Sequence, residues 1–232
     1  AALILQAVTH RFAFKEVVQG IHLRVQAGEC VALVGPSGCG KSTVLNLAAG
    51  LLTPWEGQCH NGFACTTMMF QQPRLLPWLT VLQNVALVAM FGGAALNHQQ
   101  ATEEAWKWLE FTGLQDKGDH FPDELNLHQR KFLELARALA ARPQVLLLDE
   151  VLSGLTPSEM SAAVQTIRRI RERGTSIVFV EHVMSAVLAL SDRLVVLNQG
   201  EVIAEGHPQD VMSRPEVVRA YLGDGPRSSC LQ

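Results

Sequence analysis

Short apolar runs alternate along this chain with longer amphipathic segments. Continuous apolar runs are typical of strands buried on both faces of a sheet, and they occur at 30–34 and 145–148, while 176–180 predicts a further strand. The segment 3–8 alternates weakly and predicts a strand, and 21–25 alternates apolar and polar residues, which predicts a strand with one face toward solvent. Two further strands, 193–197 and 201–204, flank the turn residues Asn198-Gln199-Gly200 and predict a hairpin.

Segments with apolar residues at helical spacing separate these strands. We predict helices at 42–49, 82–90, 99–113, 125–141, 157–173, 183–190, 208–212 and 215–222. Strands that alternate with helices indicate an α/β fold with a mostly parallel sheet covered on both faces. After Gln71 the chain has helices and few strands, which predicts a helical insertion.

Composition narrows the class of protein. With 48% apolar residues, 18% charged residues and a net charge of −3, the chain is globular and has no basic patch for nucleic acid. No signal peptide is expected, and the most apolar stretch, 85–96, has about half the length of a membrane span. The odd number of scattered cysteines argues against disulfides or zinc and favours a reducing compartment: Cys30, Cys39, Cys59, Cys65 and Cys230.

A complete phosphate-binding motif follows the apolar run 30–34. The pattern G-x-x-x-x-G-K-[ST] is formed by Gly35, Pro36, Ser37, Gly38, Cys39, Gly40, Lys41, Ser42 and Thr43. Its glycines let backbone N–H groups surround phosphate oxygens, and the helix that follows adds its positive end. Lys41 would reach the outer phosphates, and the Ser42 hydroxyl would bind Mg²⁺. The alternative, a chance glycine-rich turn, does not account for this position between a strand and a helix.

Two acids end the buried strand 145–148. In a parallel sheet the carboxyl ends of the strands meet at the ligand crevice, so Asp149 and Glu150 should lie near the phosphate loop. Asp149 would hold Mg²⁺, and Glu150 would orient the attacking water. The alternative is two solvated acids after a core strand. We therefore predict an ATPase that uses ATP and Mg²⁺.

With these two motifs in place, nearly the whole chain resembles the nucleotide-binding subunits of ABC transporters. The resemblance implies a P-loop NTPase fold of the ABC type with an N-terminal antiparallel β part. It implies a single domain, with 1–72 and 143–232 as the RecA-like core and 73–142 as a helical subdomain. It also implies a head-to-tail dimer, in which each ATP lies between one subunit's phosphate loop and the other's signature motif.

The resemblance assigns further site residues. Phe12, or alternatively Phe14, would stack on adenine. Gln71, with Gln72 as the alternative, would sense Mg²⁺ and the transporter. His182 follows the strand 176–180 and matches the switch histidine that contacts the γ-phosphate. Apolar side chains between 75 and 91 would line the groove that receives the membrane subunits, or else form the core of the helical subdomain.

The chain departs from the family at the signature motif. Where the family has L-S-G-G-Q, this chain has Leu125 followed by Asn126, Leu127, His128 and Gln129. Leu and His replace two glycines that allow close approach to the γ-phosphate of the partner's ATP. Val151 and Thr156 stand where the family commonly has Pro and Asp. We therefore predict a heterodimer in which a different chain supplies a normal signature, since a homodimer would have two poor sites.

The resemblance also implies partners and a location. The segment 72–81 is similar to importer subunits for nitrate, sulfonate or taurine, whereas 154–157 and the C-terminal half are similar to subunits for branched-chain amino acids or urea. Both imply transmembrane permease subunits, a solute-binding protein and a place on the cytoplasmic face of the membrane. The alternatives are a soluble ABC ATPase, such as one for iron–sulfur assembly, and a half that binds ATP but hydrolyses little.

Overall fold

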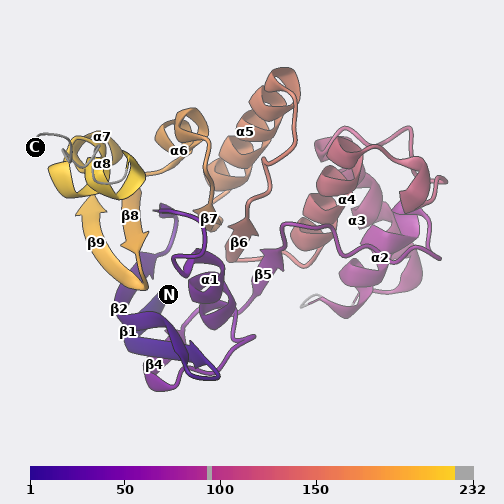
Figure 1. Cartoon of the computed structure of the whole chain (residues 1–232). Helices are drawn as coiled ribbons and strands as arrows, with labels where there is room; N and C mark the ends of the chain where they lie inside the picture. The colour runs from indigo at the N-terminus through magenta and orange to yellow at the C-terminus, as the bar shows by residue number, and fades with distance from the viewer. Residues whose placement is uncertain (93–95, 223–232) are drawn as a thin grey trace, which may run out of the picture.

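The computed structural model of this chain describes residues 1–92 and 96–222, and Figure 1 shows the arrangement of its helices and strands. Nine strands are present in this part: β1 Ala2–Phe12, β2 Lys15–Gln26, β3 Cys30–Val34, β4 Glu56–Asn61, β5 Thr66–Met69, β6 Val145–Asp149, β7 Ser176–Val180, β8 Arg193–Asn198 and β9 Glu201–Gly206. The α-helices are α1 Lys41–Ala48, α2 Val81–Phe91, α3 His98–Phe111, α4 Leu127–Ala140, α5 Pro157–Glu172, α6 Met184–Leu190, α7 Pro208–Met212 and α8 Pro215–Leu222, with a 3₁₀ turn at Pro122–Glu124.

The central sheet has six strands in the order β5-β6-β7-β3-β8-β9. All neighbours are parallel except β8 and β9, which form the predicted antiparallel hairpin. Every residue of β3, β6 and β7 is buried, as the apolar runs 30–34 and 145–148 predicted for β3 and β6. The prediction of an α/β fold with a mostly parallel sheet is therefore confirmed.

A second, antiparallel sheet has the order β2-β1-β4 and lies on the N-terminal side of the molecule (Figure 1). Strands β1 and β2 are longer than the predicted segments 3–8 and 21–25, because β-bulges interrupt their register and with it the alternation of apolar and polar residues. Strands β4 and β5 were missed by the sequence analysis. The first is a polar edge strand, and the second has only four residues, so neither shows a periodic apolar pattern.

The long helices begin at side-chain caps. Thr80, Asn97, Asn126 and Thr156 each accept a hydrogen bond from the backbone N–H three residues later, and Gln or Glu at that position caps in return. The helix predicted from residue 125 therefore starts at Leu127, because Asn126 is its cap. Helices α2, α3 and α4 pack together at one end of the molecule, beside β5 (Figure 1). The boundaries predicted for a helical subdomain, 73–142, remain a prediction.

The apolar residues form two clusters, one on each face of the six-stranded sheet. One joins the sheet to α2–α6, and the other lies between this sheet, α1 and the antiparallel sheet. Within residues 1–92 and 96–222, no helix combines the length and the apolar character needed to cross a membrane. Cys230 and residues 93–95 of the apolar stretch lie outside the described residues.

Candidate functional site

The phosphate motif forms the loop between β3 and α1, as predicted, and two of its glycines are fixed by the space around them. Gly35 has φ 147°, and a Cβ there would lie 2.0 Å from the carbonyl oxygen of Leu197. Gly40 has φ 107°, and its Cβ would lie 2.6 Å from the carbonyl oxygen of Val17. Both positions therefore exclude other residues, and β2 and β8 hold the loop in place. Ser37 and Gly38 are exposed at its tip.

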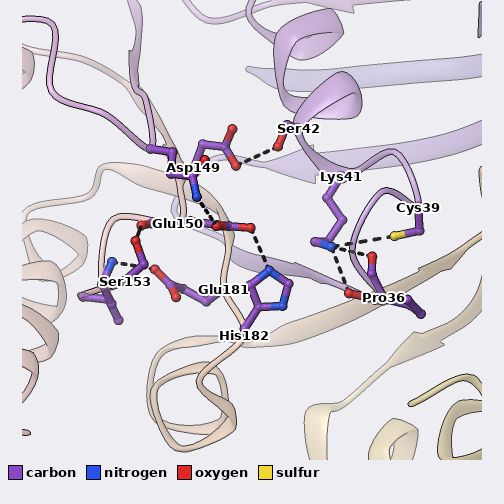
Figure 2. A network of polar contacts seen from close by, with 12 residues as sticks. Pro36, Cys39, Lys41, Ser42, Asp149, Glu150, Ser153, Glu181 and His182 are labelled. Carbon is purple, nitrogen blue, oxygen red and sulfur yellow. Dashed lines mark hydrogen bonds and ion pairs between the residues drawn. The ribbon is translucent and has the colours of Figure 1, made fainter. Parts of the chain in front are cut away.

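Lys41 lies inside the loop. Its ammonium donates to the carbonyl oxygens of Gly35 and Pro36, each at 2.9 Å, and lies 3.8 Å from the Cys39 sulfur (Figure 2). Burial raises the pKa of the Cys39 thiol, and the nearby Lys41 charge only partly opposes this effect. The loop thus holds a positive charge among its own carbonyl groups, where an anionic ligand would bind.

Ser42 and Asp149 meet across the site. Ser42 lies in the first turn of α1, and Asp149 is the last residue of β6. The Ser42 hydroxyl donates to Asp149 Oδ1 at 3.0 Å (Figure 2). Burial raises the pKa of Asp149, while the Ser42 hydrogen bond lowers it. A hydroxyl and a carboxylate this close are the hard oxygen ligands that Mg²⁺ prefers. Lys41 in the loop could bind phosphate, and the oxygens of Ser42 and Asp149 could bind Mg²⁺. The site therefore fits a nucleotide bound together with Mg²⁺.

Two side chains contact the Glu150 carboxylate through hydrogen bonds. Gln71 Nε2 donates to Glu150 Oε2 at 2.8 Å, and His182 Nε2 lies 2.7 Å from Oε1. Because an ionised carboxylate only accepts, the His182 Nε2 must carry the proton. The structure thus brings together Gln71, Glu150 and His182 from three separate chain segments. Of the two glutamines left open by the sequence, Gln71 makes this contact.

Glu150 has an unusual backbone conformation. Its φ is 50°, in the left-handed region that a non-glycine residue rarely adopts. Its N–H donates to the Val180 carbonyl at 3.0 Å, and its own carbonyl accepts from the Ser153 hydroxyl at 2.9 Å. Backbone strain of this kind is often associated with function.

Two buried ionisable residues near Glu150, Glu181 and Lys131, were not predicted from the sequence. Glu181 is only 2% exposed, accepts from the Leu152 N–H at 2.7 Å, and has a pKa that burial raises to about 7. Lys131 of α4 is also buried, and burial lowers its pKa. The available signal was a charged residue directly after the apolar run 176–180, next to His182.

The two candidate adenine-stacking residues lie at the tip of the β1–β2 hairpin. Phe12 is 50% exposed, with an edge-on contact between its ring and His10, and Phe14 is fully exposed. Neither is a core aromatic residue. Their exposure leaves a face free for stacking, and the role stays a prediction.

The predicted signature residues form the start of α4. Asn126 Oδ1 accepts from the Gln129 N–H at 2.8 Å, and the Gln129 side chain accepts from the Asn126 N–H at 3.1 Å. The His128 ring packs on Phe132 at 4.3 Å between centroids, and its buried Nε2 has no partner in the described part of the chain. Leu127 is 44% exposed. Asn126 keeps its amide N–H groups for donation, but the surface beside it is apolar and bulky.

The other departures from the family pattern have local structural roles. Val151, where the family commonly has Pro, is buried in the core beside Leu152. Thr156, in place of an Asp, is the N-cap of α5 and bonds Glu159 through both its hydroxyl and its backbone N–H, each at 2.8 Å.

A phosphate loop that faces an acidic strand end, with a glutamine and a histidine on the second acid, defines a P-loop ATPase. The sequence profile of the family described as "ABC transporter" matches residues 18–153. The chain therefore belongs to the ABC transporter family, as one of its ATP-binding and ATP-hydrolysing subunits. A second profile, "Branched-chain amino acid ATP-binding cassette transporter", matches residues 201–226.

Two relatives and two solved structures illustrate the similarity. The chain is 41% identical to "Aliphatic sulfonates import ATP-binding protein SsuB 1" of Agrobacterium fabrum, over 97% of this chain and 85% of that protein. It is 31% identical to "High-affinity branched-chain amino acid transport ATP-binding protein BraF" of Pseudomonas aeruginosa, over 96% and 98%. A nucleotide-free ATP-binding cassette from an ABC transporter superposes with a TM-score of 0.83 at 26% identity, covering 96% of this chain and 99% of that chain. A dimeric cassette in a post-hydrolysis state bound to ADP and Pi has a TM-score of 0.81 at 27% identity, covering 89% and 98%.

Proposed function

We propose that this chain powers a membrane importer of a small solute by hydrolysing ATP, as one half of an asymmetric dimer on the cytoplasmic face of the membrane. The observation that supports it most is the Glu150 carboxylate between Gln71 and His182, beside the Ser42–Asp149 pair. The names of the relatives support an importer, because they import sulfonates or transport branched-chain amino acids.

The side chains divide the chemistry among them. Lys41 and the loop N–H groups bind the phosphates, and Ser42, Asp149 and Gln71 hold Mg²⁺, which neutralises phosphate charge when bound. Glu150 orients and polarises the attacking water. His182, whose Nε2 proton points at Glu150, holds that carboxylate in position and lies ready to contact the γ-phosphate.

The start of α4 supports the asymmetry. A partner's nucleotide needs backbone N–H groups that it can approach closely, and Leu127 and His128 add bulk at this helix end. The half-site on this chain contains every side chain that ATP binding and hydrolysis require from it, including Lys41, Glu150 and His182. A second ATPase subunit with a normal signature would complete that half-site, whereas this chain's own signature would serve its partner poorly.

A cavity between β5, α2 and α4 supports docking of the permease subunits. It has a volume of about 250 Å³. Three buried polar atoms that line it lack hydrogen-bond partners among the described residues: Thr67 Oγ1, Glu134 Oε2 and Arg137 Nε. Such atoms are rare in a finished core and favour a polar segment of another subunit as the occupant.

ATP turnover by the complete membrane complex, isolated through a tag on this chain, tests the proposal. Glu150→Gln should lower turnover at least about 100-fold while ATP binding is retained, and the exposed Glu201→Gln serves as the matched control. Retained turnover in Glu150→Gln would show that this chain is a weakly hydrolysing half.

Turnover of the chain alone tests the asymmetry. We expect the isolated chain to hydrolyse ATP at least about tenfold more slowly than the complex, and His128→Ala to change the rate of the complex little. Mass spectrometry of the complex should find a second ATPase chain. Fast turnover by the chain alone, lost in His128→Ala, would contradict the heterodimer. A complex without membrane subunits would favour a soluble ABC ATPase instead.

A further inference from the structure

Lys131 is a buried cation with no place in the functions described above. It lies on α4, two residues after the signature residues 126–129, and is only 5% exposed. Burial lowers its pKa, whereas the nearby acids Glu181, Glu134 and Glu150 raise it in that order. Desolvating a lysine is unfavourable, so its position needs contacts that hold it there.

The contacts of Lys131 lead to the catalytic strand end. Its ammonium donates to the Ser153 carbonyl at 2.5 Å and to the Ser153 hydroxyl at 3.2 Å. The Ser153 hydroxyl donates in turn to the Glu150 carbonyl at 2.9 Å, and the Ser153 N–H donates to the same oxygen at 3.3 Å. Figure 2 shows Ser153 beside Glu150 in this network.

This turn fixes a backbone that would otherwise relax. Glu150 has φ 50°, and its N–H is held by the Val180 carbonyl of β7. Its carbonyl is held only through Ser153, among the contacts that the structure describes. The direction of the Glu150 side chain depends on both, because a change of its φ would swing the carboxylate away from Gln71 and His182.

Glu181, directly after β7, holds the same turn through a second contact. Its carboxylate accepts from the Leu152 N–H at 2.7 Å, at the end of β7. The turn 150–153 is thus held by Lys131 from α4 and by Glu181, which directly follows β7. Burying an ionisable side chain is unfavourable, and these hydrogen bonds offset part of that cost for Lys131 and Glu181.

We propose that Lys131 is a positioning residue for ATP hydrolysis, which ties helix α4 to the turn that holds Glu150. The inference rests on the proposed role of Glu150. Lys131 and the signature residues 126–129 lie on one rigid helix. The contact between Lys131 and Ser153 lets movement of the helical part change the rate of hydrolysis.

Steady-state ATPase of the complete membrane complex tests this role through the separation of kcat from KM. Lys131→Met keeps the length of the side chain and removes its donors, so kcat should fall about tenfold or more while KM for ATP stays within about twofold. Lys131→Arg should recover most of kcat, because it restores a donor to the Ser153 carbonyl. Lys107→Met, whose side chain is 71% exposed on α3, is the matched control.

Ser153→Ala tests the same contacts with a milder change, because it removes only the hydroxyl between Lys131 and the Glu150 carbonyl. It should lower kcat severalfold with KM unchanged, and in Lys131→Met it should add little further loss, because both changes break one chain of contacts. If Lys131→Met lowers the melting temperature so far that the complex is lost, Ser153→Ala decides, and an unchanged kcat overturns the inference.

The outcomes separate this inference from the proposed function. Wild-type and Glu150→Gln complexes with equal turnover would overturn the role of Glu150 itself. An active wild type, an inactive Glu150→Gln and a fully active, folded Lys131→Met would overturn only the positioning role of Lys131. Equal losses of kcat and ATP affinity in Lys131→Met, without recovery in Lys131→Arg, would mean that the residue only stabilises the fold.

Discussion

Replacing Glu134 with glutamine should stabilise the isolated chain, and more so as the pH rises. Glu134 lies on α4 in the cavity beside β5 and is only 6% exposed. One of its oxygens is 3.4 Å from the Arg74 N–H, and the other has no hydrogen-bond partner in the described part of the chain. Burial raises the pKa of this carboxyl from 4.5 to about 7, although Arg74 and Arg137 oppose the rise.

The sign of the pH dependence follows from which state binds the proton. The unfolded chain releases the Glu134 proton near its ordinary pKa of 4.5, whereas the folded chain keeps it up to about pH 7. The contribution of Glu134 to the free energy of unfolding is therefore fully present below pH 4.5 and is lost as the pH rises to 7. A pKa difference of roughly 2.5 corresponds to about 3 kcal/mol in the free energy of unfolding, as an upper figure.

Glutamine has nearly the same shape and no charge at any pH. Glu134→Gln should therefore gain about 2–3 kcal/mol over the wild type between pH 5 and pH 8. The raised pKa of Glu181 is present in both proteins and cancels from the difference. A buried acid that lowers stability suits a docking site, where a donor from another subunit would pair with it.

Urea unfolding of the purified chain at several pH values from 5 to 8 measures this difference directly. Glu110→Gln, at an exposed position on α3, is the control and should show no such trend. An equal stability difference at pH 5 and pH 8, or a wild type that gains on Glu134→Gln as the pH rises, would refute the argument from burial.

Three further predictions concern the loop and the fold around it. Gly35→Ala would place a methyl group 2.0 Å from the Leu197 carbonyl oxygen, so it should abolish binding of a fluorescent ATP analogue and cost about 3 kcal/mol or more in thermal unfolding. Alkylation of Cys39, slow because the thiol is buried with a raised pKa, should block ATP binding, and ATP should protect it. ATP binding that persists in the fully alkylated chain would contradict this placement. Asn84, fully buried, accepts from the Leu76 N–H and donates to the carbonyls of Leu76, Leu79 and Thr80, so Asn84→Leu should cost about 2–4 kcal/mol in urea unfolding. A cost below about 1 kcal/mol, or one equal to that of the exposed control Gln99→Leu, would argue against it.

The main elements and the motif residues were predictable because each depends on local pattern. The apolar runs at 30–34 and 145–148 predicted buried strands, which are β3 and β6, and the phosphate motif lies between a strand and a helix in one continuous segment. The strands that escaped prediction, β4 and β5, owe their place to pairing with neighbours, since β4 is polar and β5 is short.

The sequence by itself determined the class of fold, the phosphate loop and the two acids, because apolar periodicity and motif spacing are local properties of the chain. Only the tertiary structure decided which glutamine contacts Glu150. It also decided that Lys131 and Glu181 hydrogen-bond to the turn 150–153. Those contacts join residues that are 22 to 79 positions apart. Their distances depend on how helices and strands pack, and no local pattern of residue types records that packing.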